Sequence, residues 1–206
     1  MSKLIDELIK EGWLKTPNII KAFKKVKRRD FLLDDSEELS EINEALPIGF
    51  DQTISQPAVV AFMLEKLEPK AGDKILDVGS GSGWTTALLS EIVGSKGKII
   101  GIEIIPQLVK FGIKNAEKYG FVKAGIAKFI CGDGSLGYEK EAPFDKILCS
   151  ASASDKVPKA WKEQLKVKGK IVTPINYSIW LFTKLSENNF EKKEYPGFTF
   201  VPLVKK

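Results

Sequence analysis

The fold of this chain is decided by the stretch Ile75-Leu76-Asp77-Val78-Gly79-Ser80-Gly81-Ser82-Gly83-Trp84. An apolar, strand-like segment passes directly into three alternating glycines and then into a sequence that suits a helix. Glycines in this pattern let the backbone turn sharply and approach a ligand closely at the start of the helix. A tight turn alone needs one or two glycines, so the third favours a ligand-binding loop in an α/β domain.

Strand-like and helical segments alternate around this glycine loop. Apolar runs typical of buried strands occur at 74–78, 98–104, 127–131, 146–149 and 170–173, and helical patterns occur at 84–93, 106–119 and 157–165. This alternation predicts a doubly wound, mostly parallel, Rossmann-like α/β sheet. The strand-like segments 179–185 and 198–204 flank a polar turn at 187–189, which predicts antiparallel C-terminal strands.

The sequence before the first strand predicts helices and a long loop. Leu4 and Leu8 repeat at helical spacing, and Thr16-Pro17 supplies an N-cap and a first-turn proline for a second helix. Residues 30–54 show neither the helical nor the strand periodicity and are expected to form a long loop. Loops of this length are usually functional or disordered. A further helix is expected from Gln56-Pro57 to about residue 67.

The chain length predicts one domain. Residues 1–206 are enough for a single domain, and the alternating pattern extends through most of them. We expect residues 1–56 to form a helical extension that contains the loop, and residues 57–206 to form the Rossmann-like core.

Composition restricts the chemistry of the chain. It has no histidine, which excludes histidine-based triads, histidine general bases and histidine-ligated metal sites. Two cysteines cannot form a four-thiolate site, so we expect no metal. Cys131 and Cys149 lie in apolar runs and are expected to be small core residues. The absence of a signal-like segment and of a long apolar run predicts a cytoplasmic protein that does not bind membranes.

The net charge of +5 does not by itself indicate nucleic-acid binding. Residues 156–206 contain 11 lysines and 4 acidic residues, but most of these lysines are scattered singly, as on a solvated face. The compact basic cluster at 24–29 lies at a probable helix end, where cations complement the helix dipole. We therefore expect no nucleic-acid partner.

The glycine loop favours S-adenosylmethionine (SAM) over a dinucleotide. A dinucleotide fingerprint has glycine where this chain has Trp84, and it places a pyrophosphate over the helix start. Asp77 precedes the loop, and its charge would repel phosphates but suits the cationic SAM. Glu103 lies twenty residues beyond Gly83, at the end of the next strand, where a carboxylate can accept both ribose hydroxyls.

A third acid follows the next strand. Asp133, between Gly132 and Gly134, can accept a hydrogen bond from an adenine amino group, although alone it is more simply an ordinary turn aspartate. Three acids at successive strand ends lie along the edge where open α/β sheets bind ligands. The pattern resembles the class I SAM-dependent methyltransferases, with S-adenosylhomocysteine as product. The predicted cofactor-binding residues are Asp77, Val78, Gly79, Ser80, Gly81, Ser82, Gly83, Glu103, Ile104, Asp133 and Gly134.

The 46–57 segment bears on the methyl acceptor. It reads Leu46-Pro47-Ile48-Gly49-Phe50-Asp51-Gln52-Thr53-Ile54-Ser55-Gln56-Pro57. The hydroxyls of Thr53 and Ser55 can donate to an anion at the start of the following helix, but Ser55 can equally cap that helix. A carboxylate acceptor is ionised at pH 7 and needs no general base, which is compatible with a chain that lacks histidine.

The 46–57 segment closely resembles the substrate loop of the protein-L-isoaspartate O-methyltransferase family. The glycine loop, Glu103 and residues 27–31, 132–134, 143–147 and 200–203 are also similar to that family. The resemblance implies a SAM-dependent enzyme that methylates the free α-carboxylate of L-isoaspartyl residues in damaged proteins, with isoaspartyl proteins and peptides as partners. It implies Ser55 as the catalytic residue and Thr53, Ile54 and Ser55 as substrate-binding residues.

The chain departs from the family pattern at 41–43, at 149–155, at Lys168-Gly169 and at 178–181, and two other functions stay open. The family usually has a Tyr-x-Asp pair where this chain has Glu41 and Asn43. The alternatives are a SAM-dependent RNA methyltransferase that uses the basic C-terminal region and a non-catalytic SAM-binding module. For the isoaspartate methyltransferase we expect a monomer.

Overall fold

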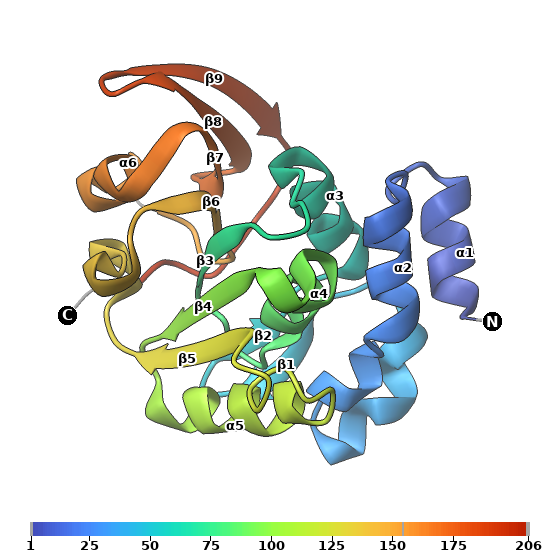
Figure 1. Cartoon of the computed structure of the whole chain (residues 1–206). Coiled ribbons are helices and arrows are strands. Elements are labelled where there is room, and N and C mark those ends of the chain that lie inside the picture. The colour runs from blue at the N-terminus through green and yellow to red at the C-terminus, as the bar shows by residue number, and fades with distance from the viewer. Residues whose placement is uncertain (1, 154, 205–206) are drawn as a thin grey trace.

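The computed structural model describes residues 2–153 and 155–204, which contain a seven-stranded mixed sheet (Figure 1). The strand order is β5-β4-β3-β6-β7-β8-β9. The strands from β5 to β7 pair in parallel, and β8 and β9 are antiparallel to their neighbours. The strands are β3 (Lys74–Val78), β4 (Lys98–Glu103), β5 (Ala127–Cys131), β6 (Phe144–Cys149), β7 (Leu165–Ile175), β8 (Ser178–Ser186) and β9 (Asn189–Pro196). The predicted mostly parallel sheet with antiparallel C-terminal strands is confirmed.

Helices cover both faces of the sheet. They are α3 (Pro57–Leu67), α4 (Trp84–Val93), α5 (Pro106–Glu117) and α6 (Lys159–Gln164), with short 3-10 turns η3 (Gly94–Lys96), η4 (Gly134–Leu136) and η5 (Glu139–Glu141). Ile75 of β3 is fully buried in the apolar cluster that includes α3 and α4, whereas its neighbour Leu76 is fully buried in the cluster that includes Trp161 of α6. Successive side chains of a strand point to opposite faces, so a strand covered on both sides is apolar throughout.

No described helix is both long and apolar enough to cross a membrane.

The N-terminal helices are held by acids that are distant in the sequence. They are α1 (Lys3–Lys10) and α2 (Pro17–Lys25). The Glu41 carboxylate accepts hydrogen bonds from the Ser2 hydroxyl and the Leu4 N–H, at 2.7 and 3.2 Å, at the start of α1. The Thr16 hydroxyl donates to Glu65 at 2.7 Å. Thr16 is the N-cap residue of α2, as predicted. Because its hydroxyl is bound to Glu65, the side chain does not bond the helix.

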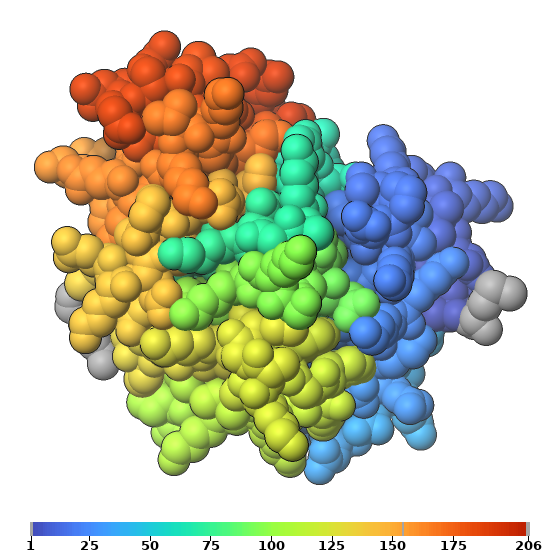
Figure 2. All heavy atoms as spheres, viewed as in Figure 1, coloured from blue at the N-terminus to red at the C-terminus, as the bar shows by residue number. Residues whose placement is uncertain are grey.

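The N-terminal helices share their core with the middle of the chain. Leu8 of α1 and Ile19 of α2 are buried in the same apolar cluster as Leu64 of α3 and Leu88 of α4. Figure 2 shows the blue N-terminal atoms packed directly against the teal and green atoms that follow them in the sequence. The extension is thus continuous with the sheet domain in its packing.

The prediction of an irregular loop over residues 30–54 is wrong. This region contains the end of the 3-10 helix η1 (Arg28–Phe31) and the longer 3-10 helix η2 (Asp34–Glu41). These are followed by a hairpin of β1 (Leu46–Gly49) with β2 (Gln52–Ile54). The hairpin turns at Phe50 and Asp51, which both have a φ of 56°, as a two-residue primed turn requires. These elements are too short to produce a visible periodicity.

The prediction of a strand over residues 198–204 is also wrong. The partner of β8 is β9, most of whose residues are exposed, so this edge strand lacks the apolar signal of a buried one. Residues 198–204 instead run as a tail beside the end of β6. There the Ser152 N–H donates to the Val201 carbonyl at 2.7 Å, and the Leu203 N–H donates to the Ser152 carbonyl at 2.8 Å.

One of the two cysteines does not lie in the core. Cys149 is fully buried in β6, as expected, but Cys131 at the end of β5 is exposed, so the prediction is wrong for Cys131. An apolar run does not guarantee burial of its last residue, because a strand end lies at the rim of the sheet. Both thiols are free.

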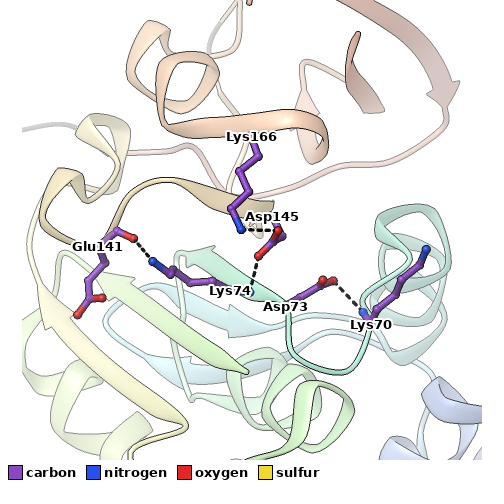
Figure 3. Close-up of polar contacts among 6 residues, drawn as sticks. All are labelled: Lys70, Asp73, Lys74, Glu141, Asp145 and Lys166. Atoms are coloured by element: carbon purple, nitrogen blue, oxygen red, sulfur yellow. Dashed lines mark hydrogen bonds and ion pairs between the residues drawn. The ribbon is translucent and has the colours of Figure 1, made fainter. Parts of the chain in front are cut away.

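Ion pairs and backbone contacts hold the amino ends of the strands together (Figure 3). The Lys74 N–H donates to Asp145 at 2.9 Å, and the Lys74 ammonium donates to the Glu141 carbonyl at 2.8 Å. Asp145 also pairs with Lys166 at 2.7 Å, and the Lys70 N–H donates to Asp73. These contacts fix the starts of β3, β6 and β7 and lie opposite the edge to which the glycine loop belongs.

A buried lysine of β8 caps helix α6. Lys184 is 2% exposed, and its ammonium donates to the carbonyls of Lys162 and Leu165 at 3.1 and 2.9 Å. A cation complements the partial negative charge at the C-terminal end of a helix. Glu187, which is mostly exposed, pairs with the same ammonium at 2.9 Å.

We expect Lys184→Met to lower the free energy of unfolding by about 2–4 kcal/mol, because both carbonyls lose a charged donor in a buried place. The matched control is Lys192→Met, since Lys192 is an exposed lysine of the adjoining strand β9. Urea unfolding of both variants measures the effect. Equal midpoints for the two variants would contradict the capping role.

Candidate active site

Three adjoining cavities form one cleft at the carboxyl ends of β3, β4 and β6. The central cavity lies between the glycine loop and the 46–57 segment. A second cavity shares Gly79 and Glu103 with it, and a third shares Ser55 and Val201 with it. Because neighbouring cavities share walls, one continuous site lies along this edge of the sheet.

The glycine loop depends on left-handed backbone conformations. Gly79, Gly81 and Gly83 have φ values of +74°, +49° and +85°, which residues with a Cβ rarely adopt. At Gly83 an added Cβ would also lie 2.9 Å from the carbonyl oxygen of Gly112 in α5. The third glycine therefore allows α4 to begin in direct contact with the backbone of α5.

The amides of the glycine loop are largely taken up by protein acceptors. The N–H groups of Gly79 and Ser80 donate to the carbonyl of Ile102 at 2.8 and 3.1 Å, and the Gly83 N–H donates to the Ser80 carbonyl at 2.7 Å. A pyrophosphate at a helix start needs free amides. These contacts thus support the prediction that the loop does not bind a dinucleotide.

Glu103 joins the glycine loop to the end of β4. The side chain is 7% exposed, and its two oxygens accept the N–H groups of Gly81 and Ile105, each at 3.0 Å. Each carboxylate oxygen has a second lone pair for a further donor. Because Glu103 lines both the central and the second cavity, this acceptor capacity is available to a ligand in the cleft.

Asp77 lies beneath the loop rather than in the lining of the cleft. It is fully buried and accepts hydrogen bonds from the Thr85 and Thr86 hydroxyls at 2.8 and 2.6 Å. Burial raises the pKa of Asp77 to about 6, against hydrogen bonds that lower it, and the charge of Glu103 adds to the rise. Asp77 therefore fixes the first turn of α4 next to the cleft, and its charge contributes to the electrostatic potential there.

Ser55 lines the cleft and does not cap α3. The N-cap residue of α3 is Gln56, and its side chain does not bond the helix. The Ala58 N–H instead donates to the side-chain oxygen of Asn43 at 3.0 Å, and the Gln56 amide donates to the Asn43 carbonyl at 2.9 Å. The capping alternative for Ser55 is wrong, because Asn43 performs this task and leaves Ser55 in the wall of two cavities.

Asp133 stabilises a turn at the far end of the cleft. Its carboxylate accepts the Ser135 N–H at 2.8 Å as the N-cap of η4. The neighbouring Gly134 lines the second cavity, and a Cβ there would lie 2.5 Å from Val78. A role for Asp133 towards adenine stays a prediction.

Most of the predicted site residues meet in this cleft. They are Thr53, Ile54, Ser55, Val78, Gly79, Ser80, Gly81, Ser82, Glu103, Ile104 and Gly134, whereas Asp77, Gly83 and Asp133 do not line these cavities. Sequence reasoning missed Ser150 and Ala151, although they follow β6 at the same edge of the sheet. It also missed the contribution of Val201, which only the pairing of the tail with Ser152 brings to the cleft.

Comparison with known proteins identifies the family. A family model described as protein-L-isoaspartate(D-aspartate) O-methyltransferase matches residues 1–206. The chain is a member of this family. A protein-L-isoaspartate O-methyltransferase of Methanopyrus kandleri is 38% identical over 98% of this chain and 90% of its own length. A second relative of that name, from Archaeoglobus fulgidus, is 42% identical over 90% of this chain and 84% of its own length.

Solved structures of protein-L-isoaspartate O-methyltransferases have the same fold. A crystal structure of such a protein from Plasmodium falciparum, in complex with S-adenosyl-L-homocysteine, matches with a TM-score of 0.89 and 25% identity over 100% of this chain and 98% of that chain. Another protein-L-isoaspartate O-methyltransferase matches with a TM-score of 0.87 and 28% identity over 97% of this chain and 64% of that chain. The family and the class I methyltransferase fold predicted from the sequence are confirmed.

Asp77 makes stability in this member of the family depend on pH. Because its pKa rises from 3.8 to about 6 on folding, the folded state binds more protons between about pH 4 and pH 6. Relative to Asp77→Asn, the unmodified chain should therefore gain about 2 kcal/mol of stability as the pH falls from 7 to 4. Urea unfolding of both proteins across this range gives the difference, in which the other titrating groups cancel. A difference that does not vary with pH would contradict this assignment.

Proposed function

We propose that this chain transfers a methyl group from SAM to the free carboxylate of L-isoaspartyl residues in damaged proteins, with S-adenosyl-L-homocysteine as the other product. The observation that carries the proposal is the position of Ser55, which lies across the central cavity from the glycine loop. A cofactor on the loop and an acceptor at Ser55 would therefore meet in one cavity. Membership of the family agrees with this activity.

The residues of the cleft fit SAM. The one charged side chain among the described residues that line the three cavities is Glu103, an acid that suits a cationic ligand with ribose hydroxyls. The Ser80 hydroxyl oxygen is buried and has no hydrogen-bond partner, so it is open to a polar group of a ligand. Residues 79–83 would hold the amino-acid part, Glu103 the ribose, and the second cavity beside Gly134 the adenine.

The chain's own residues then need only to position the acceptor. SAM, when bound, supplies an electrophilic methyl group on a positively charged sulfur. The isoaspartyl carboxylate is ionised at pH 7, so no side chain has to remove a proton. Ser55 and Thr53 would donate to one carboxylate oxygen and direct the other towards the methyl group. Because two opposite charges cancel as the reaction proceeds, an enclosed cleft favours the step.

The third cavity would take the peptide around the isoaspartyl residue. Its lining includes residues 199–201 of the tail, the N-cap residue Gln56 and Val59 of α3. None of its described lining side chains is charged, so backbone contacts and apolar surface would hold peptides of varied sequence.

We further propose that residues 1–206 act as one monomeric domain in the cytoplasm. The N-terminal helices share an apolar core with α3 and α4, which supports one domain. The two free thiols suit a reducing compartment.

Ser55→Ala should lower kcat with an isoaspartyl peptide about tenfold to hundredfold, because a hydrogen bond to a charged group is lost. The dissociation constant of SAM, measured by calorimetry, should stay the same. Ser95→Ala is the matched control, since Ser95 is exposed in the 3-10 turn η3. Equal turnover of the two variants would remove Ser55 from the reaction.

The substrate itself is tested with a pair of peptides that differ only in an isoaspartyl or an aspartyl residue. Methyl transfer from labelled SAM should occur to the isoaspartyl peptide and be negligible with the aspartyl peptide. Equal rates for both peptides, or no transfer to either by a chain that binds SAM, would overturn the proposed function.

Glu103→Gln should weaken SAM binding about tenfold or more. Both oxygens of Glu103 accept backbone N–H groups, so an amide in its place would turn its NH₂ group towards one of these donors. Calorimetric titration with SAM measures the loss, and Glu139→Gln, at an exposed residue of η5, is the control. Unchanged affinity in Glu103→Gln would place the ribose elsewhere.

A further inference from the structure

Arg28 is a buried cation whose acceptors are carbonyl groups. The side chain is 6% exposed, and its Nη1 and Nη2 atoms donate to the carbonyls of Ile42 and Glu44 at 2.8 and 2.6 Å. Nη2 also contacts the carbonyl oxygen of Ser55 at 3.5 Å. No carboxylate of the described chain forms an ion pair with Arg28, which is unusual for a buried arginine. The expectation that the 24–29 cluster complements the end of a helix is therefore wrong for Arg28, which lies beyond the end of α2 and binds these carbonyls instead.

The position of Arg28 is itself firmly fixed. The preceding Lys27 N–H donates to the Tyr119 hydroxyl at 2.7 Å, and that hydroxyl donates to Asp30. The ring of the fully buried Phe31 stacks on Tyr119 with 5.9 Å between the ring centroids. The η1 turn is thus attached to the end of α5, so Arg28 has little freedom to move away from Ser55.

Arg28 also contacts the other wall of the central cavity. Its guanidinium lies over the ring of Trp84, 5.6 Å from the ring centroid. Trp84 is the first residue of α4, directly after the glycine loop, and it lines the central cavity. One side chain therefore connects the backbone of Ser55 to the helix that carries the cofactor loop.

The charge of Arg28 complements the proposed acceptor. The described residues that line the cleft include no lysine or arginine, and Glu103 together with the buried Asp77 makes the region acidic. Glu103 and Asp77 repel a carboxylate that enters such a cleft, and a guanidinium on the Ser55 side adds to the positive charge of the SAM sulfur in offsetting this repulsion. Burial lowers the pKa of Arg28 to about 10, so the guanidinium remains charged at pH 7.

We propose that Arg28 is a positioning residue for methyl transfer, which fixes the Ser55 carbonyl and supplies the positive charge behind Ser55 that favours a carboxylate acceptor. This proposal rests on the proposed function. A lysine cannot reproduce it, because a single ammonium cannot present the planar fork that reaches carbonyls of both the 42–44 stretch and Ser55.

The first test compares Arg28→Lys and Arg28→Met with Arg29→Met. Arg29 is the exposed neighbour of Arg28, so its variant controls for the loss of an arginine. We expect kcat with the isoaspartyl peptide to fall about tenfold to hundredfold in both Arg28 variants and to stay unchanged in Arg29→Met. The dissociation constant of SAM should change less than about threefold in all three. An Arg28 variant with the kcat of Arg29→Met would overturn the proposal.

The second test separates charge from shape by chemical rescue. A cavity of about 420 Å³ reaches Arg28 and Trp84 from the side of α1 and α2, so a small solute can enter the space left in Arg28→Ala. Guanidinium chloride at a concentration that does not unfold the variant should restore part of the rate. Urea, which has the same planar shape without the charge, and sodium chloride should not. Equal rescue by urea would overturn the part of the proposal that concerns charge.

The third measurement does not depend on activity. Amide hydrogen exchange of residues 42–56 should accelerate in the Arg28 variants and stay the same in Arg29→Met, while exchange in β3 and β4 is unchanged. Faster exchange throughout the sheet, with a loss of SAM affinity equal to the loss of rate, would show a merely structural role and overturn the proposal. The unmodified chain is assayed alongside, so a failure of the proposed function appears as absent methyl transfer in that protein.

Discussion

The left-handed backbone of Gly79, Gly81 and Gly83 is the constraint on which the rest of the site depends. It turns β3 into α4 within five residues and lets α4 begin against the backbone of Gly112. The loop is then tied to the end of β4, through the Ile102 carbonyl and the Glu103 carboxylate. Because most of its amides already have acceptors within the protein, the loop offers shape and an acidic neighbour rather than an anion site. That choice favours a cationic nucleoside over a phosphorylated one.

The charged side chains at the amino ends of the strands form ion pairs that stabilise the sheet, whereas two acids beside the cleft at the carboxyl ends have no cation partner among the described residues. At the amino edge the carboxylate of Asp145 is neutralised by Lys166 and by a backbone N–H of Lys74. At the carboxyl edge the two acids Asp77 and Glu103 are buried without an ion pair to any described residue, and they meet only hydroxyl or amide donors. Burying a carboxylate without a cation is costly, as the raised pKa of Asp77 shows. A ligand that brings its own positive charge reduces this cost, so the site is more stable when occupied.

The sequence predicts the buried strands and the glycine loop well, because each depends on local rules. A strand covered on both faces is a continuous apolar run, and a left-handed turn requires glycine. The prediction fails where a segment is defined by a distant partner. The charged edge strand β9 forms because β8 pairs with it, and the 198–204 tail lies at the cleft because Ser152 accepts and donates there. In the same way, the burial of Arg28 among five basic residues depends on carbonyls that lie fourteen or more positions away.

The departures at Glu41 and Asn43 show how such distant contacts serve the site. Neither side chain lines the cleft, and each instead binds the amino end of a helix: Glu41 at α1 and Asn43 at α3. The intervening carbonyl of Ile42 and the following one of Glu44 turn the other way, towards Arg28. Residues 41–44 therefore bind the amino ends of α1 and α3 and also the guanidinium of Arg28. Through Arg28 they are connected to the backbone of Ser55. In this chain, positions 41 and 43 thus supply acceptors for helix amides, and their side chains make no contact with the cleft.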